Sequence, residues 1–300
     1  MYAVQFSWRP SNIPAFTHGS LEVMSSYENY TATSAHYDAT REPIGVEIIL
    51  GCLARRGRPL AEQILVDAGC GTGSYSLALV DHVARIEAVD MNEGMLGVAK
   101  TKLADAQAAG RIRFHRAAIE GLPLDDTSVD AVMINQVLHH LPDDAAEAWP
   151  LTRKVIGEFA RVLRPGGVLV VNFCSHEQLR RGWWFFPLIE PIAERMIERH
   201  VPPVELESLI ADCGFDPCGR FVPSDAILQG SSYFDPWGPL DATWRAGDSV
   251  WAMLTPEELD RVEKLVRGMD DRGELKDFVA EHDAERVHVG QATFLYATRR

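Results

Sequence analysis

The chain has 300 residues, of which 46% are hydrophobic, enough for one large α/β domain with insertions or for a core with a small cap. Its formal net charge of -14, without any lysine- and arginine-rich run, argues against nucleic acid as a partner, because phosphate backbones carry the same sign. Five scattered cysteines without a CxxC pair predict neither a disulfide framework nor structural zinc, so we expect a reducing cytoplasm. No segment approaches twenty consecutive apolar residues, so we expect no membrane insertion.

Turn signals and apolar runs predict a core with two insertions. In chain order we expect an N-terminal arm and lid segment over 1–40, a core over 41–175, a cap insertion over 176–203, a continuation of the core over 204–228, a second cap insertion over 229–289 and a final core strand over 290–300. Helices are predicted over 44–53, from Ser74, from Met91, over 144–163, 188–199 and 204–213, and from Thr255. Strands are predicted at 64–66, 86–90 and 168–173, within 220–228 and at 291–298.

A glycine-rich turn follows the first predicted strand, with the sequence Asp67-Ala-Gly-Cys-Gly-Thr-Gly73. A dinucleotide fingerprint places its third glycine one position later, where this chain has Ser74, so a nicotinamide oxidoreductase fits poorly. An acid at the strand end suits a cationic ligand that carries an amino-acid tail. The next strand ends at Asp90, about twenty residues further on, where a carboxylate can accept both hydroxyl protons of a ribose.

Aromatic residues gather in the two insertions, including Trp183 and Trp184 in the first. Together they predict a lid with an apolar or aromatic acceptor pocket. The alternative is that the large rings only bury a small cap domain.

The turn ending at Gly73 resembles motif I of the class I S-adenosylmethionine (SAM)-dependent methyltransferases. The stretches 112–124 and 128–141 and the turn within 161–170 resemble the ubiquinone/menaquinone-type small-molecule methyltransferases, type 11, and the likeness covers about 27–175. It implies an α/β fold with a Rossmann-like, doubly wound seven-stranded sheet of order 3-2-1-4-5-7-6, the last strand antiparallel, with helical and aromatic cap insertions. It also implies SAM as cofactor and S-adenosylhomocysteine as product.

The resemblance also assigns candidate site residues. The cofactor-binding residues would be Tyr37, Asp67, Ala68, Gly69, Cys70, Gly71, Gly73, Asp90, Met91, Met95, Ala118, Ile119, Glu120, Asn135 and Gln136. Position 118 departs from the family pattern, which has an acid there that accepts from the adenine amino group. Adenine recognition would therefore rest on the Ile119 backbone N–H, on apolar packing or on Glu120. The substrate-binding residues would be Tyr30, Cys174, Trp183 and Trp184.

Two adjacent histidines, His139 and His140, follow the fourth strand at the mouth of the expected site. A histidine with a pKa near 6.5 can take a proton from a hydroxyl, thiol or amine as the methyl group moves. We therefore predict a catalytic base here, with helix capping or packing as the alternative. Adjacent histidines without an acid-rich cluster do not predict a metal site.

The predicted function is methyl transfer from SAM to a small, apolar or aromatic molecule by in-line displacement, catalysed by a monomer or homodimer. Two alternatives remain from the sequence. A metalloid or soft-ion methyltransferase would use the thiolates of Cys174, Cys213 and Cys218. A non-catalytic module that binds SAM is the second, because Ala118 replaces the expected acid.

Overall fold

The computed structural model describes residues 41–55 and 57–300. The predictions for the N-terminal arm, with Tyr30 and Tyr37, lie outside the described residues.

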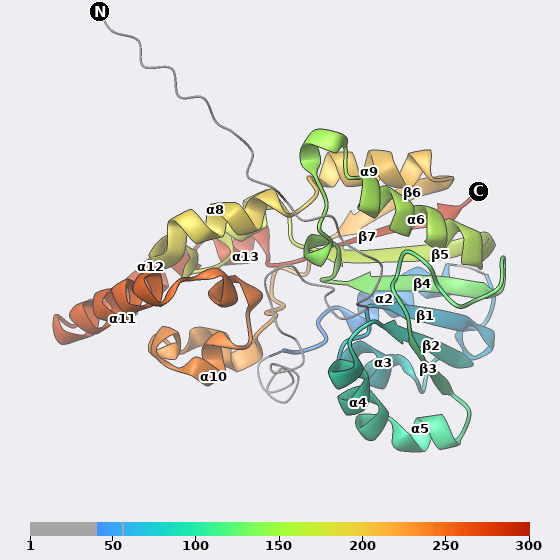
Figure 1. The fold of residues 1–300 in the computed structure, drawn as a ribbon, viewed down its shortest axis with the longest axis horizontal. Helices are drawn as coiled ribbons and strands as arrows, with labels where there is room; N and C mark the ends of the chain where they lie inside the picture. Colours follow the sequence, from blue (N-terminus) through green and yellow to red (C-terminus); the bar gives the residue numbers. More distant parts are fainter. Residues whose placement is uncertain (1–40, 56) are drawn as a thin grey trace, which may run out of the picture.

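The centre of the described chain is a seven-stranded sheet with the order β3-β2-β1-β4-β5-β7-β6 (Figure 1). Its strands are β1 Ile64–Ala68, β2 Arg85–Asp90, β3 Ile112–Arg116, β4 Val129–Asn135, β5 Leu163–Phe173, β6 Phe215–Phe221 and β7 Thr293–Arg299. Strand β7 pairs antiparallel with both β5 and β6, while the pairings among β1 to β5 are parallel. The predicted fold class, strand order and antiparallel last strand are confirmed.

Alternate side chains of the strands enter two separate apolar cores, one on each face of the sheet. Leu65 belongs to one core and the adjacent Val66 to the other. The first core includes residues of α2 Val46–Ala54, α3 Ser74–Leu79, α4 Glu93–Lys102 and α5 Ala104–Ala108. The second includes residues of α6 Pro150–Val162 and α9 Pro203–Asp212, which lie on the opposite side in Figure 1. The sheet is therefore doubly wound.

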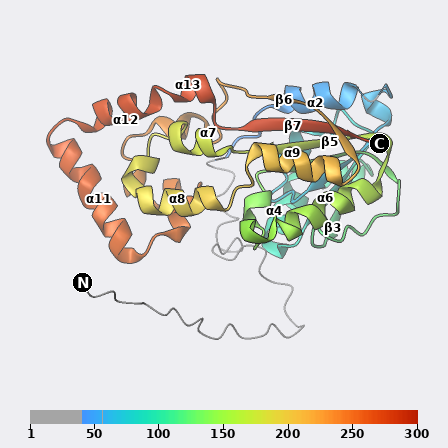
Figure 2. The same ribbon diagram turned by 90° about the horizontal axis from the view of Figure 1, so that it is seen from above.

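Both insertions pack together beyond the carboxyl ends of the parallel strands (Figures 1 and 2). Their helices are α7 His176–Arg181, α8 Glu190–Glu198, α10 Ala242–Arg245, α11 Pro256–Asp271, α12 Leu275–Asp283 and α13 Arg286–Val289. Tyr233 of the second insertion binds the first, because its carbonyl accepts from Trp184 Nε1 at 2.7 Å and its hydroxyl accepts from the Trp184 backbone N–H at 3.1 Å. The cap is thus one packed unit that two distant segments form.

Two predicted boundaries were wrong. The sixth strand was predicted within 220–228 but lies at 215–221. The sequence did not indicate a strand there because Pro217 and Gly219 have a low strand propensity. Such residues are tolerated at the edge of a sheet, where β6 lies. Helix α6 begins at Pro150 and not near Asp144, since Ala148 and Trp149 have positive φ angles of 59° and 58°.

Candidate functional site

A cavity opens at the carboxyl ends of β1, β2 and β4, with about 840 Å³ of space that includes its opening to solvent. This is the edge at which open α/β sheets bind ligands. It is lined by Arg41, Glu42, Pro43, Asp67, Gly69, Cys70, Gly71, Thr72, Ser74, Tyr75, Asp90, Met95, Asn135, Gln136, Val137, His140 and Leu228. We call it the first cavity.

The glycine turn brings bare backbone to the first cavity. Gly69, Gly71 and Gly73 have φ angles of 74°, 53° and 78°, a region that side chains other than glycine rarely adopt. A Cβ atom at Gly69 would lie 2.6 Å from Cγ2 of Val137, so no side chain fits there. At Gly71 a Cβ atom would meet nothing within 4 Å, so this position faces open space. A ligand can therefore lie directly on the Gly71 backbone.

The carboxylate of Asp90 is oriented by two backbone donors. Its Oδ2 accepts from the Gly71 N–H at 2.8 Å and its Oδ1 from the Asn92 N–H at 2.8 Å. Burial raises the pKa of Asp90, and hydrogen bonds from the backbone lower it in part. Each oxygen keeps a further lone pair for a ligand, and a pair of vicinal hydroxyls matches that arrangement.

A second acid, Asp67 at the end of β1, lines the same cavity. Burial raises its pKa to about 7, opposed by the Ser76 hydroxyl, which donates to Oδ2 at 2.7 Å; the charge of Asp90 raises the pKa further. A positively charged ligand would favour ionisation of both acids. The prediction of a site for a cationic ligand thus agrees with the placement of these acids.

The end of β4 supplies a buried amide without a partner. Neither Oδ1 nor Nδ2 of Asn135 has a hydrogen bond within the described part of the chain, although both atoms are buried. The next residue, Gln136, adopts a positive φ of 55° and is held by Asn172, whose Oδ1 accepts from Gln136 Nε2 at 2.9 Å. Buried amides normally have partners, so Asn135 is suited to bind a polar ligand in the first cavity.

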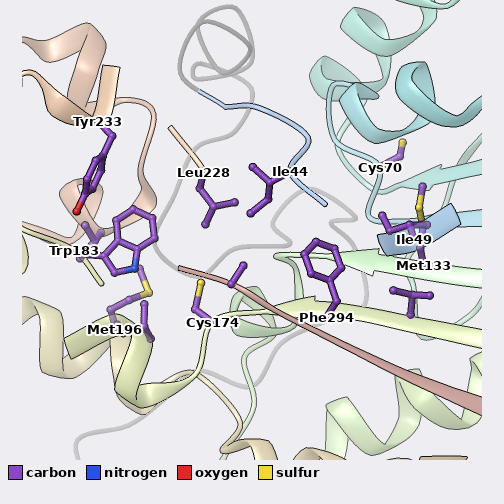
Figure 3. Packing of buried hydrophobic residues seen from close by; sticks show 14 of the residues in the cluster. Ile44, Ile49, Cys70, Met133, Cys174, Trp183, Met196, Leu228, Tyr233 and Phe294 are labelled. Carbon is purple, nitrogen blue, oxygen red and sulfur yellow. The ribbon is translucent and has the colours of Figure 1, made fainter. Parts of the chain in front are cut away.

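A second cavity, of about 470 Å³, adjoins the first beneath the cap. It is lined by Arg41, Gln136, His139, His140, Cys174, Leu179, Trp183, Phe186, Met196, His200, Leu228, Asp248 and Ser249. Figure 3 shows how Leu228 and Ile44 lie between the side chains of the cap, such as Trp183, and those of the sheet, such as Phe294. The two cavities share Arg41, Gln136, His140 and Leu228.

Three buried histidines line one wall of the second cavity. The ring of His139 lies 4.0 Å from that of His140 and stacks on His200 at 4.4 Å, measured between centroids. Burial lowers the pKa of His140 to about 3 and that of His200 to about 4, and lowers the pKa of His139 as well. All three rings are therefore uncharged at neutral pH.

A charged pair, Arg41 and Asp248, also lines the second cavity. Arg41 Nη2 lies 3.5 Å from Asp248 Oδ2. Burial raises the pKa of Asp248, while the guanidinium of Arg41 lowers it. An ionised pair leaves the walls of the cavity without net charge.

The structure gathers part of the predicted site. Nine of the predicted residues line the first cavity: Asp67, Gly69, Cys70, Gly71, Asp90, Met95, Asn135, Gln136 and His140. His139, Cys174 and Trp183 line the second. Neither cavity is lined by Ala68, Gly73, Met91, Ala118, Ile119, Glu120 or Trp184, whose predicted contacts stay predictions. Trp184 is fully buried in the cap.

Other lining residues were missed by the sequence analysis. Thr72, Ser74 and Tyr75 lie in or directly after the glycine turn, so their position in the motif could have indicated them. His200 and Asp248 lie in or beside the insertions, where no motif marks them.

The three cysteines of the soft-ion alternative do not converge. Burial raises the pKa of Cys174 to about 12, and its thiol donates to Gln136 Oε1 at 3.3 Å. The thiol of Cys213 donates to the Arg153 carbonyl, while Cys218 is exposed on β6. Over residues 41–55 and 57–300, no three His, Cys, Asp or Glu residues are grouped to hold a metal ion. In the same residues no helix has the length and apolarity to cross a membrane.

Comparison with known proteins finds a family match for the residues that form much of this site. Residues 66–171 match a family described as a methyltransferase domain. The chain is 33% identical over 145 residues to a demethylmenaquinone methyltransferase of Clavibacter sepedonicus, covering 47% of this chain and 55% of the relative. It is 32% identical over 126 residues to an uncharacterised methyltransferase of Mycobacterium tuberculosis, covering 42% and 58%. The chain thus spans little more than half the length of these relatives.

Solved structures share the fold. A putative methyltransferase from an antibiotic biosynthesis pathway of Anabaena variabilis superposes with a TM-score of 0.67 at 21% identity, covering 87% of this chain and 99% of its own. The geranyl diphosphate C-methyltransferase of Streptomyces coelicolor, solved with Mg²⁺, geranyl diphosphate and S-adenosylhomocysteine, gives 0.51 at 15% identity, covering 85% and 78%. Residues 66–171 therefore match a methyltransferase domain, and the chain shares its fold with solved methyltransferases.

Proposed function

We propose that this chain, whose residues 66–171 match a methyltransferase domain, is a SAM-dependent enzyme that transfers a methyl group to a small apolar or aromatic molecule. The observation that carries the proposal is the pair of adjoining cavities at the carboxyl ends of the parallel strands. Two acids and glycine backbone line the first, rings of the cap line the second, and Gln136 and His140 border both. This arrangement suits a cationic donor beside an apolar acceptor, shielded from water.

The residues of the first cavity fit the donor. When bound, SAM supplies an electrophilic methyl group on a positively charged sulfonium. Asp90 would hold the ribose hydroxyls, since the N–H groups of Gly71 and Asn92 fix both of its oxygens. Asn135 would turn its buried amide oxygen toward positive charge, because an amide stabilises a cation without attacking it.

His140 is the proposed proton acceptor at the border of the cavities. Because burial keeps its ring uncharged, a ring nitrogen can take a proton from the nucleophile of the acceptor. Its lowered pKa makes it a weak base, so the proton would pass on to solvent after transfer. His139 lines only the second of these two cavities and stacks on His200, which favours a supporting role.

The acceptor class rests on the cap and not on the names of relatives. The matched residues 66–171 end before both insertions, which supply much of the second cavity. Apolar and aromatic walls, from Leu179, Phe186 and Met196, support a small acceptor with an apolar body. The expectations of a cytoplasmic monomer or homodimer remain predictions.

Calorimetric titration with SAM and with S-adenosylhomocysteine tests the cofactor. We expect micromolar binding that Asp90→Ala weakens about 10- to 150-fold, the range for hydrogen bonds to a charged group. Glu93→Gln is the matched control, because Glu93 lies three residues away with its side chain 62% exposed, paired with Arg116. No heat with either ligand, or equal loss in both variants, contradicts the proposal.

A further inference from the structure

The side chain of Trp183, which lines the second cavity, has an indole N–H without a partner among the described residues. Trp183 is 3% exposed. Two other indoles of the cap have acceptors: Trp184 Nε1 donates to the Tyr233 carbonyl at 2.7 Å, and Trp244 Nε1 to the Ser232 carbonyl at 2.7 Å. A buried donor without a protein partner, on a side chain that lines a cavity, indicates a ligand that accepts there.

The ring of Trp183 is held by its neighbours. It stacks on Phe186 with centroids 5.8 Å apart and an interplanar angle of 23°, and it makes edge contacts with Phe185 at 5.7 Å and with Tyr233 at 6.2 Å. Such packing prevents the indole from turning toward another acceptor. Figure 3 shows the ring beside Met196 and near Cys174, which line the same cavity. The direction of the donor is therefore set before any ligand binds.

The walls of the second cavity favour an uncharged ligand. Burial keeps His139, His140 and His200 neutral, and the charges of Arg41 and Asp248 compensate each other at 3.5 Å. An additional charge inside this cavity would be desolvated without a dedicated counterion among the described lining residues.

The lining of the cavity favours a compact ring. Phe186, Met196 and Leu228 offer aromatic, thioether and aliphatic surfaces on which a planar ring packs well.

We propose that Trp183 determines acceptor specificity by donating its Nε1–H to a carbonyl oxygen of a compact, uncharged aromatic acceptor in the second cavity. Trp183 lines the second cavity but not the first, whereas His140 borders both, so the acceptor extends from the indole toward His140. Its nucleophilic group then lies at the border with the first cavity. This inference rests on the proposed function. It adds the chemical class of the acceptor and the residue that recognises the acceptor.

Three probes of one ring size test the inference in the presence of saturating S-adenosylhomocysteine, with binding measured by calorimetry. The probes are 4-hydroxyacetophenone, which has a neutral carbonyl, 4-ethylphenol, which lacks it, and 4-hydroxybenzoate, which is an anion. We expect the ketone to bind about 2- to 12-fold more tightly than 4-ethylphenol, the net contribution of one hydrogen bond. The anion should bind most weakly.

Two tryptophan variants assign the preference to one atom. Trp183→Phe keeps an aromatic ring and removes the donor, so the preference for the ketone should disappear. Trp251→Phe is the matched control, because Trp251 is also buried, lines neither cavity, and has an Nε1 without a partner in residues 41–55 and 57–300. It should keep the preference.

Several outcomes overturn the inference while the proposed function stands. The first is equal binding of the ketone and 4-ethylphenol by the unmutated protein, which a water bound to Nε1 would give. The second is that the anion binds most tightly, and the third is that the preference for the ketone survives in Trp183→Phe. The fourth is that the protein binds S-adenosylhomocysteine but none of the probes. The comparison of probes in the unmutated protein does not depend on the stability of a variant. Loss of S-adenosylhomocysteine binding in the unmutated protein would instead refute the proposed function.

Discussion

Substitution of Gly71 by alanine separates ligand contact from backbone strain. Its φ of 53° makes any side chain costly, and the left-handed region raises the free energy of an alanine by about 1–2 kcal/mol. The added Cβ meets no protein atom within 4 Å, so steric overlap adds nothing to this cost. At about 2–4 °C per kcal/mol, the melting temperature should fall by about 2–8 °C. The methyl group would occupy the space in which we place the cofactor, so affinity for S-adenosylhomocysteine should fall at least tenfold.

Gly110→Ala provides the matched control. Gly110 has a φ of 73° and equally open surroundings, and it lies between α5 and β3 outside both cavities. Its variant should lose similar stability and keep its full affinity for S-adenosylhomocysteine. Differential scanning fluorimetry measures the first quantity and calorimetry the second. Unchanged affinity in Gly71→Ala would refute the placement of the cofactor on this backbone.

Three further predictions concern pH and the cap. Burial raises the pKa of Asp67 from 3.8 to about 7. Without ligand, its contribution to stability is therefore complete below pH 3.8 and is lost as the pH rises through 7. In urea unfolding from pH 5 to 8, the free energy of unfolding should fall with rising pH, and this fall should be smaller in Asp67→Asn. Trp184→Phe leaves the Tyr233 carbonyl without its donor and should lower the free energy of unfolding by about 1–3 kcal/mol, with unchanged affinity for S-adenosylhomocysteine. Thr255→Ala removes the hydroxyl that caps Glu258 N–H and should cost about 0.5–2 kcal/mol in denaturant unfolding, again without change in binding.

The first cavity was largely predictable because its chemistry is continuous in the sequence. Asp67, Gly69 and Gly71 occupy one turn, and the short apolar runs before Asp67 and Asp90 indicate two buried parallel strands. The carboxyl ends of such strands meet at one edge of a sheet, which brings the two acids together. Local sequence therefore specifies both the fold of this segment and the groups that it presents.

Other features were not predictable from local patterns. Strand β6 has a low strand propensity, since Pro217 and Gly219 interrupt it, and it forms because β7 offers a partner across the sheet. The late start of α6 depends on Trp149, whose Nε1 donates to Glu205 of α9 at 2.7 Å. In both cases a contact between distant segments overrides the local preference.

The second cavity shows why the proposed acceptor site could not be predicted from the sequence. Trp183 comes from the first insertion, while Asp248 comes from the second. Tyr233 of the second insertion holds the two together, because it accepts hydrogen bonds from the backbone N–H and the Nε1 of Trp184. In the sequence, each insertion is marked by aromatic residues, a pattern that fits a cap core as well as a binding site. The distinction depends on single atoms: Trp184 Nε1 has a protein acceptor and Trp183 Nε1 has none in the described residues. The proposed donor site thus depends mainly on one motif and the strand that follows it, whereas the proposed acceptor site depends on how two insertions pack.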